Sequence, residues 1–427
     1  MAWFFWPDMR PELKSARVAT NSPTIVVGRN IQVSVDRPKV IHQGCTIDVD
    51  PTDANRLFVA SMIGYEPNGI LGYWSHDGGA TWHLGYDGTG RRGCDESLAF
   101  GPDGTLHLVH MRESPRTGDD KRYNIPGPPP GFEDSSYDVE FYRSLDGGKN
   151  FEKRQTIEQF IDRPQLAVDC TNSKYRGTVY CNANEGTAWA VAYRAARDTG
   201  EFLPSELPQR KIMTPYPSNP VILSDGTVVC CYNEVPRMIE IGAPPILTVL
   251  RSNNGGQFFA LAGRVATAYK HPTFRSWLAA TPVPYPILAV DSSPKFRDRL
   301  FCVWVDGPQL YKTYILCSSS DDRGATWSAP VVLSEQPLDQ SNQDIWTADY
   351  PAIAVNRDGV VAVTWYDRRG REAQIRERPG PNVRYPILRG YDLRIRLSTD
   401  GGESWSASKI ISEKPGEGEL VEVRGWV

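Results

Sequence analysis

Short apolar runs, each followed by a polar turn and a second apolar run, recur through this sequence of 427 residues. The length of the runs, and the Asp, Gly, Pro and Ser residues between them, are typical of β-hairpins. Successive hairpins start about 50 to 70 residues apart, which suits a four-stranded sheet plus a loop. The pattern therefore predicts an all-β chain in which six antiparallel, four-stranded blades close into a β-propeller. The expected blades start near residues 43, 94, 162, 218, 284 and 349.

The two ends of the chain bear on how such a ring closes. Residues 16–42 contain the strand-like run TIVVGRNIQVSV, which we expect to supply a closing outer strand beside the last blade. The tail GEGELVEVRGWV resembles the opening of a further unit, so a seven-bladed ring is the alternative architecture. Because each repeat covers the apolar face of its neighbour, we expect one domain over residues 1–427.

A second motif, Ser-x-Asp/Asn-x-Gly-x-x-aromatic, occurs five times, and a degenerate version lies around residues 193–202. Asp or Asn can bond to nearby backbone, Gly supplies a positive φ, and the aromatic residue packs beneath the turn. The copies are SHDGGATW from Ser75, SLDGGKNF from Ser144, SNNGGQFF from Ser252, SDDRGATW from Ser320 and STDGGESW from Ser398. This motif resembles the Asp-box of the sialidase superfamily, the group of BNR-repeat β-propellers.

Composition and charge narrow the class of protein further. Aromatic residues at 11%, with 37 Gly and 34 Pro, suit short strands and tight turns, so helix should be scarce. A formal net charge of −4 argues against nucleic acid or an anionic membrane as the main partner. No apolar run reaches the ~20 residues of a membrane span, and no targeting signal is visible. We expect a monomer that binds carbohydrate, with secreted or periplasmic locations left open.

Cysteine and histidine residues offer few candidate disulfides, metal sites or catalytic bases. The eight Cys residues lack paired metal-ligand spacing, although Cys170 and Cys181 flank a turn across which they could form a disulfide. His107 and His110 are three residues apart on a strand, hence on opposite faces, so we expect no shared metal and no cofactor. His42 and His110 are candidate bases, although a lone His is more often structural.

Three long insertions, at residues 111–136, 234–245 and 367–390, are predicted to share one face of the ring. Long loops at one mouth of a rigid scaffold usually carry function. The third insertion is rich in arginine, whose planar guanidinium groups suit carboxylate or sulfate ligands, although single arginines are usually solvated or paired. Its arginines are Arg368, Arg369, Arg371, Arg376, Arg378, Arg384 and Arg389.

Carboxylates and tyrosines recur where inner strands begin and where second strands end. Paired carboxylates support acid and base chemistry, and a Tyr beside a Glu can act as a nucleophile, but an Asp before Pro can equally fix the start of a strand. The first group comprises Asp95, Glu96, Asp162, Tyr285, Asp349 and Tyr350, and the second comprises Asn184, Glu234, Asp306 and Asp367.

The resemblance to sialidases implies a glycoside hydrolase acting on an anionic, carboxylate-bearing sugar. Exo-sialidases use an arginine triad for the substrate carboxylate, a Tyr with a Glu partner as nucleophile, and an Asp as acid/base. The corresponding catalytic residues would be Asp95 as acid/base and Glu234 with Tyr350 or Tyr366. The corresponding substrate-binding residues would be Arg92, Arg163, Arg275, Arg368, Asp349 and Trp346.

Two other classes stay open. Sialidases carry an Arg-Ile-Pro string before the first blade, and the nearest stretch here is Asp36-Arg37-Pro38. A polysaccharide lyase would use a Tyr or His to remove a proton while Arg neutralises a uronate. A propeller can also bind a carbohydrate or a protein without catalysis, since a fold does not dictate a function.

Overall fold

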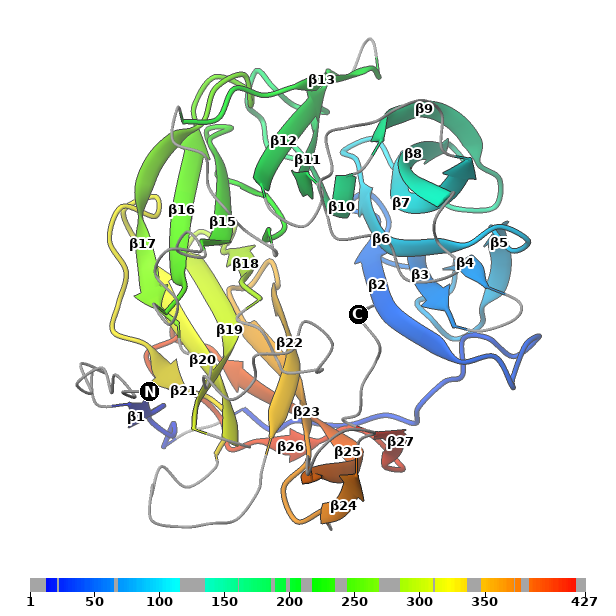
Figure 1. The fold of residues 1–427 in the computed structure, drawn as a ribbon. Coiled ribbons are helices and arrows are strands. Elements are labelled where there is room, and N and C mark those ends of the chain that lie inside the picture. The colour runs from blue at the N-terminus through cyan, green and yellow to red at the C-terminus, as the bar shows by residue number, and fades with distance from the viewer. Residues whose placement is uncertain are drawn as a thin grey trace, which may run out of the picture.

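Six antiparallel sheets stand around a common axis, which makes the molecule a six-bladed β-propeller (Figure 1). The structure, a computed structural model, describes residues 13–20, 23–64, 68–115, 135–159, 161–185, 189–196, 200–208, 217–234, 244–268, 285–309, 312–335, 347–371, 373–377 and 384–419. These residues contain strands and turns and no helix. The predicted six-bladed fold is confirmed, and the seven-bladed alternative is wrong.

Blades one to three each contain four strands in chain order from the axis outward. Blade one consists of β2 (His42–Val49), β3 (Leu57–Ile63), β4 (Gly69–Ser75) and β5 (His83–Asp87). Blade two consists of β6 (Gly93–Phe100), β7 (Leu106–Pro115), β8 (Ser135–Ser144) and β9 (Glu152–Gln159). Blade three consists of β10 (Ile161–Val168), β11 (Val179–Glu185), β12 (Trp189–Ala195) and β13 (Phe202–Pro204).

Blades four to six follow the same plan, with additions in the last two. Blade four consists of β14 (Val221–Ile222), β15 (Val228–Glu234), β16 (Ile246–Ser252) and β17 (Ala260–Thr267). Blade five consists of β18 (Ile287–Val290), β19 (Leu300–Gln309), β20 (Lys312–Ser320) and β21 (Val331–Val332), with β1 (Lys14–Ser15) added in parallel outside β21. Blade six consists of β22 (Ala348–Val355), β23 (Val361–Asp367), β25 (Arg384–Ser398) and β26 (Lys409–Ile410), and β24 (Ala373–Glu377) and β27 (Gly416–Glu419) also pair with β25.

The residues before the first blade lie against blades five and six. After β1 joins blade five, Val18 forms a parallel bridge with Trp405 at the end of the blade-six Asp-box. Residues 24–35 form no strand, in contrast to the closing strand expected there. Instead, the Asn30 backbone N–H donates to Glu413 at 2.8 Å and its side-chain amide donates to the Ile411 carbonyl at 3.0 Å.

Buried side chains form apolar clusters, several of which join neighbouring blades. One apolar cluster spans blades one to three, a second spans blades four and five, and a third spans blades five and six. Trp304 and Trp365, both fully buried, anchor the last two clusters. Burying each such side chain contributes roughly 1.5–3 kcal/mol, so contacts between blades account for much of the stability of the ring.

Each Asp-box forms the turn between the third and fourth strands of its blade. In the first box, the Asp77 carboxylate accepts hydrogen bonds from Ser75 Oγ (2.8 Å), Thr81 N (2.9 Å) and Thr81 Oγ1 (2.6 Å). In the second box, Gly148 has φ +96°, and an added Cβ would lie 2.3 Å from Phe58 of blade one. That glycine is required both by its backbone conformation and by the close approach of the neighbouring blade.

Cys170 and Cys181 do not form the disulfide that their spacing permits, because both thiols are free. The Cys170 thiol lies 3.5 Å from the Phe100 carbonyl, and the Cys181 thiol points to the Asn182 carbonyl. In the part of the chain described, no helix is long and apolar enough to cross a membrane.

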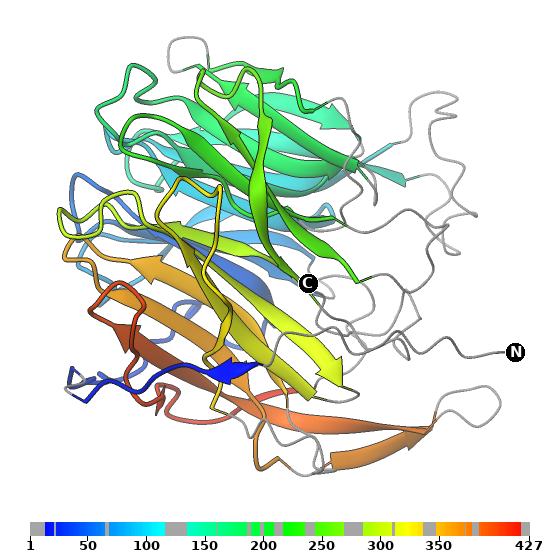
Figure 2. The same ribbon diagram turned by 90° about the vertical axis from the view of Figure 1, so that its left-hand side faces the viewer.

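The two faces of the ring differ in their connections. Figure 2 shows β24 and the first half of β25 projecting beyond the blades at the end opposite the β25–β26 Asp-box turn. The connections from β7 to β8, from β15 to β16 and from β23 to β25 leave at the end where β6, β14 and β22 begin, because these strands are antiparallel neighbours. We call this end the loop face and the other end the turn face.

Candidate functional site

Four inner strands share one irregularity near the loop face. In each of them, the pairing with the second strand slips by a residue, which is a β-bulge. The slips lie between Gln43 and Thr46 in β2, Cys94 and Ser97 in β6, Asp162 and Gln165 in β10, and Asp349 and Ala352 in β22. A bulge changes the direction of the side chain that it carries, and bulges are common beside active sites.

Each bulge contains a residue with a left-handed backbone conformation. The φ values are 60° at Gly44, 49° at Asp95, 54° at Arg163 and 49° at Tyr350. For a residue with a side chain this conformation costs about 1–2 kcal/mol, and such strain persists mainly at functional positions. Asp298 and Arg323 are the other non-glycine residues with positive φ in the described chain, and both lie in turns of the turn face.

A pair of carboxyl groups lies where blades two and three meet. Desolvation and the neighbouring Asp162 carboxylate raise the pKa of Asp95 to about 7, although Arg163 opposes this. Asp162 contacts Arg163 at 3.1 Å and accepts from the Asn184 amide at 3.4 Å. Asp95 Oδ2 and Asp162 Oδ1 are buried and lack a hydrogen-bond partner among the described residues. The raised pKa lets Asp95 hold a proton at a higher pH than an ordinary carboxyl group, as a general acid requires.

Glu96, the residue after Asp95 in β6 of blade two, extends this acidic region toward blade one. Glu96 is buried, and desolvation raises its pKa well above the usual range. A Cβ added to Gly44 would lie 3.9 Å from Glu96 Oε1, so the first bulge borders this carboxyl group. Desolvation and Glu96 raise the pKa of Cys45 to about 11, so its thiol is not a nucleophile at neutral pH.

Three tyrosines line the loop face of blade six. The Tyr350 side chain is 43% exposed, and its ring centroid lies 5.6 Å from that of Tyr366. Tyr366 in turn stacks on Tyr391 at 4.1 Å. Desolvation, Tyr391 and Cys45 raise the pKa of Tyr366, which places the blade-six tyrosines next to blade one. The candidate site is thus an arc across blades six, one, two and three.

Two residues expected to bind substrate lie behind this arc. Arg368 and Asp349 are only 3% and 1% exposed. The Arg368 guanidinium lies 3.5 Å from Asp349 Oδ2, and Thr313 Oγ1 donates to Asp349 Oδ1 at 3.2 Å. These contacts place Arg368 inside blade six rather than at a surface open to a ligand.

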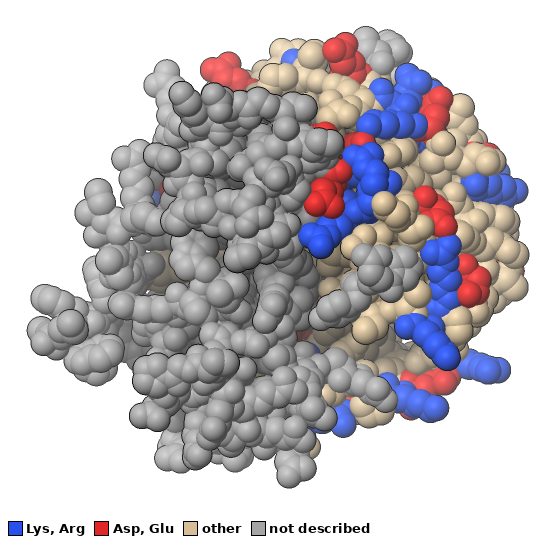
Figure 3. Space-filling view, turned by 45° about the vertical axis from the view of Figure 1, so that its right-hand side comes forward, with Lys and Arg blue, Asp and Glu red and all other residues tan. Residues whose placement is uncertain are grey.

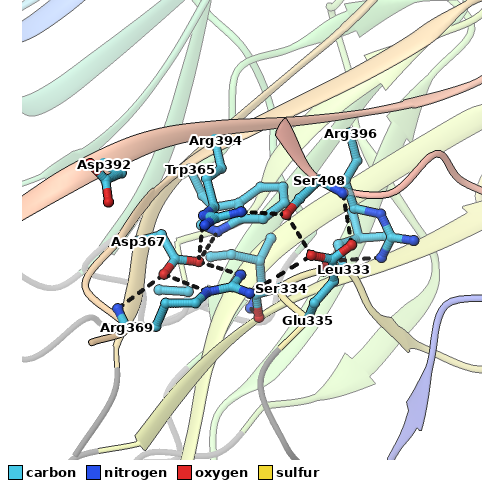
Figure 4. Close-up of polar contacts among 12 residues, drawn as sticks. Leu333, Ser334, Glu335, Trp365, Asp367, Arg369, Asp392, Arg394, Arg396 and Ser408 are labelled. Atoms are coloured by element: carbon cyan, nitrogen blue, oxygen red, sulfur yellow. Dashed lines mark hydrogen bonds and ion pairs between the residues drawn. The ribbon is translucent and has the colours of Figure 1, made fainter. Parts of the chain in front are cut away.

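The carboxylate of Asp367, at the end of β23, is already occupied by protein donors (Figure 4). It accepts from Trp365 Nε1 at 2.9 Å and from Arg369 Nη2 at 2.7 Å, and Arg394 lies 3.8 Å away. Desolvation acts to raise the pKa of Asp367, but the bonds from Arg369 lower it overall. Asp367 therefore stabilises blade six as an ion-paired carboxylate.

Surface charges elsewhere are mixed in sign. On the face seen in Figure 3, basic and acidic side chains of the described residues are interspersed. Arg143 pairs with Glu152 at 2.5 Å, and Arg371 of the arginine-rich insertion pairs with Asp392 at 2.7 Å. For Arg369 and Arg371, the expectation that single arginines are paired matches the structure.

The remaining predicted site residues are scattered. Glu234 lies at the end of β15 in blade four, and Thr248 Oγ1 donates to its carboxylate at 2.7 Å. Arg92 is exposed just before β6. Arg275 and Trp346 lie outside the described residues. Glu234 belongs to blade four and so lies outside the arc.

The histidines have different surroundings. His110 is fully buried; its Nδ1 lies 3.1 Å from the Met111 carbonyl, so this nitrogen carries the proton and Nε2 accepts from Tyr86 at 2.7 Å. Desolvation lowers the pKa of His110 to about 4, which fits a structural, neutral role. Desolvation also lowers the pKa of His42, which begins β2 and contacts Ser61 Oγ at 2.5 Å.

Some residues of the arc were missed by sequence reasoning. Gly44 and Cys45 would follow from aligning the strand starts QGCT, CDES, DRPQ and DYPA, which occupy the same position in four blades. No local pattern marks Tyr391, because it reaches Tyr366 through strand pairing across a long insertion.

Comparison with known proteins agrees with this architecture. Residues 73–84 match the BNR/Asp-box repeat family. The K499G mutant of NanB sialidase from Streptococcus pneumoniae superposes with a TM-score of 0.52 at 9% identity, over 81% of this chain and 68% of that one. The fold is that of a sialidase-type β-propeller.

Two further sialidase-type propellers superpose comparably. The leech intramolecular trans-sialidase gives a TM-score of 0.52 at 11% identity, covering 80% of this chain and 67% of its own. The intramolecular trans-sialidase from Ruminococcus gnavus gives 0.50 at 10% identity, covering 79% and 92%. No curated protein matches the sequence. At such low identity the likeness concerns the fold, and the chemistry must be argued from the arc itself.

Proposed function

We propose that this sialidase-type propeller is a glycoside hydrolase that acts on a carboxylate-bearing sugar. The observation that carries the proposal is the chemistry at the three strained bulges. They hold an acid (Asp95), a cation (Arg163) and a phenol (Tyr350) near one face of the ring. With its pKa raised to about 7 by desolvation and Asp162, Asp95 suits a proton donor at neutral pH.

In the first half of the proposed reaction, the Asp95 carboxyl gives its proton to the glycosidic oxygen as the bond to the leaving group breaks. The Tyr350 phenol oxygen attacks the anomeric carbon, and Glu234 accepts the phenol proton. A phenol suits an anionic sugar because a carboxylate nucleophile would be repelled by the carboxylate of the substrate.

In the second half, the Asp95 carboxylate takes a proton from water, and the resulting hydroxide attacks the anomeric carbon. The bond to Tyr350 breaks, and the phenol recovers its proton from Glu234. Arg163 and Arg92 are proposed to bind the carboxylate of the sugar, since a guanidinium fork matches that group. Arg275, which precedes blade five in the sequence, is a third candidate.

A turnover screen tests this proposal. Purified protein is incubated with aryl sialosides, aryl uronides and a panel of acidic polysaccharides, and new reducing ends and free aryl alcohol are measured. The proposal expects release from at least one anionic substrate and loss of that activity in the Asp95→Asn variant. Full turnover in Asp95→Asn would overturn the role of Asp95, and binding without turnover on every substrate would point to a non-catalytic propeller.

One observation favours β-elimination on a uronate polysaccharide as a second candidate. His42 lies at the loop-face end of β2, desolvation lowers its pKa, and its Nε2 is buried with no hydrogen-bond partner among the described residues. A neutral imidazole can remove the proton beside a uronate carboxylate. Ultraviolet absorbance of an unsaturated product, lost in His42→Ala but kept in Tyr350→Phe, would support this reaction over hydrolysis.

A further inference from the structure

Five residues of blade six form a closed circuit of contacts around Tyr350. The Asp349 carboxylate contacts Arg368 at 3.5 Å, and the Arg368 guanidinium lies over the Tyr391 ring at 5.3 Å. Tyr391 stacks on Tyr366 at 4.1 Å, and Tyr366 contacts Tyr350 at 5.6 Å between ring centroids. Tyr350 follows Asp349 in the chain, so the circuit returns to its start.

The circuit is assembled by strand register. Asp349 of β22 lies opposite Tyr366 of β23, and Tyr366 lies opposite Leu393 of β25. Tyr391 is therefore two residues from the position directly opposite Tyr366, a diagonal spacing across which aromatic rings can touch. Three neighbouring strands of one blade each supply one ring.

The back of the circuit is fixed. Arg368 donates to the Gly390 carbonyl at 3.0 Å, and its backbone N–H donates to the Thr347 carbonyl at 2.9 Å. Gly416 of β27 packs on Tyr391 so closely that an added Cβ would lie 2.2 Å from the ring. Arg368 and Asp349 are buried, and β27 packs on Tyr391. Tyr350 is therefore the most exposed member of the circuit.

Such support matters because Tyr350 holds a strained backbone. A tyrosine at φ 49° is an uncommon conformation for a bulky residue, and it persists only where surrounding contacts hold it. Gly44 at the equivalent position of blade one carries no side chain to hold. In blade six the contacts act on the ring itself, at the end that faces the loops.

We propose that Asp349, Arg368, Tyr391 and Tyr366 are positioning residues that hold the Tyr350 phenol where it meets the anomeric carbon. This inference rests on the proposed function and changes two roles expected from the sequence: Arg368 and Asp349 act through Tyr350 and do not bind the substrate. Displacing a nucleophile by about 1 Å can lower the reaction rate about 100-fold. Loss of one contact in the circuit should therefore lower the rate of the chemical step strongly.

Kinetics separate positioning from carboxylate binding. Arg368→Gln and Tyr391→Leu are expected to lower kcat by about 100-fold with KM nearly unchanged, while Tyr391→Phe, which keeps the stacked ring, retains most activity. The loss in Arg368→Gln should be equal for a carboxylate substrate and for its neutral primary-amide analogue. A rise in KM confined to the carboxylate substrate would overturn the inference and make Arg368 a ligand-binding residue.

A spectroscopic readout keeps the test independent of turnover. With 3-fluorotyrosine at position 350, the native protein should give one sharp ¹⁹F resonance, which broadens or splits in Tyr391→Leu and Arg368→Gln. Arg394→Gln serves as the matched control. Arg394 lies on β25, the strand that carries Tyr391, but among the described residues it contacts Asp367 and Ser408 and no member of the circuit. An unchanged resonance in the folded circuit variants would refute the circuit, even if no substrate were ever found.

Discussion

Aspartates on the two faces of this ring experience opposite environments. On the turn face, hydrogen bonds from Thr81 and Ser75 lower the pKa of Asp77 to about 2. On the loop face, desolvation and a second carboxylate raise the pKa of Asp95 to about 7. An aspartate surrounded by hydrogen-bond donors thus stays ionised and stabilises a turn. An aspartate in a desolvated site beside a second carboxylate keeps its proton to a higher pH.

Backbone strain shows the same division. The turn face places its positive φ values mostly on glycine, as at Gly78 and Gly147 of the first two Asp-boxes. At the four bulges of the loop face, one such value falls on Gly44 and the other three fall on residues with side chains, Asp95, Arg163 and Tyr350. A fold optimised only for stability would use glycine at those positions too. The difference indicates that the turn face stabilises the ring. On the loop face, strained backbone lowers the stability but places particular side chains where function requires them.

Replacing Asp95 by Asn should produce the largest effect. Asn cannot transfer a proton, so kcat should fall by at least about 100-fold. The folded pKa of Asp95 lies above its unfolded value of 3.8, so the native carboxyl costs stability progressively as pH rises from 3.8 toward 7. The variant should therefore be more resistant to urea than the native protein at pH 8, and the gap should close near pH 4. Equal stability at both pH values would argue against the raised pKa.

Acid should destabilise the core through its buried histidines. Desolvation lowers the pKa of His110 from 6.5 to about 4, so protons bind the unfolded chain first as pH falls through this interval. The loss should reach about 3 kcal/mol of unfolding free energy at pH 4. In His110→Gln, whatever its stability at pH 8, urea unfolding should show a shallower decline between pH 6.5 and 4. An identical slope in both proteins would contradict a neutral buried His110.

Removing a turn-face aspartate should act on stability alone. Asp146 accepts hydrogen bonds from Ser144 Oγ at 2.8 Å and from the Lys149 and Asn150 backbone at 3.0 Å. Asp146→Ala should cost about 2 kcal/mol in urea unfolding and leave kcat unchanged, in contrast to Asp95→Asn. A large fall in kcat with normal stability would mean that the two faces are not separate in function.

The sequence predicts the turn face better than the loop face for a physical reason. Each Asp-box is encoded within eight residues, since Ser, Asp, Gly and the aromatic ring contact one another locally, as in the turn from Ser75 to Trp82. The number and starts of the blades follow from repeated hairpins of equally local character. Residues 24–35 were expected to supply a closing strand because their sequence is strand-like, but pairing depends on a free neighbouring edge, which no local pattern reveals.

The loop face depends on contacts between distant segments. Asp95, Arg163 and Tyr350 are identifiable by their equivalent places in the repeats, but their strain and the raised pKa of Asp95 arise only when the blades meet. Arg368 shows the limit of such reasoning. Its charge predicts that it binds the carboxylate of a substrate, but in the structure it pairs with the carboxylate of Asp349 in its own blade.

Two arginines with positive φ allow the smallest and sharpest comparison. Arg323 (φ 63°) lies in the blade-five Asp-box, at the place where Gly78 and Gly147 stand in the first two boxes. Arg323→Gly should relieve strain and raise the unfolding free energy by about 0.5–1 kcal/mol, less the small contribution of its exposed ion pair with Asp225. Turnover should not change.

Arg163 (φ 54°) lies on the loop face, and Arg163→Gly removes the same kind of strain. It also removes the cation that pairs with the largely buried Asp162 carboxylate, so the relief of strain should not raise the stability measured in urea. KM should rise for an anionic substrate more than for a neutral analogue. Equal effects of the two substitutions on KM would mean that strain on the loop face has no link to substrate binding. A stability gain in Arg323→Gly alone, with a KM penalty in Arg163→Gly alone, would tie the strained side chain to function on one face of the ring.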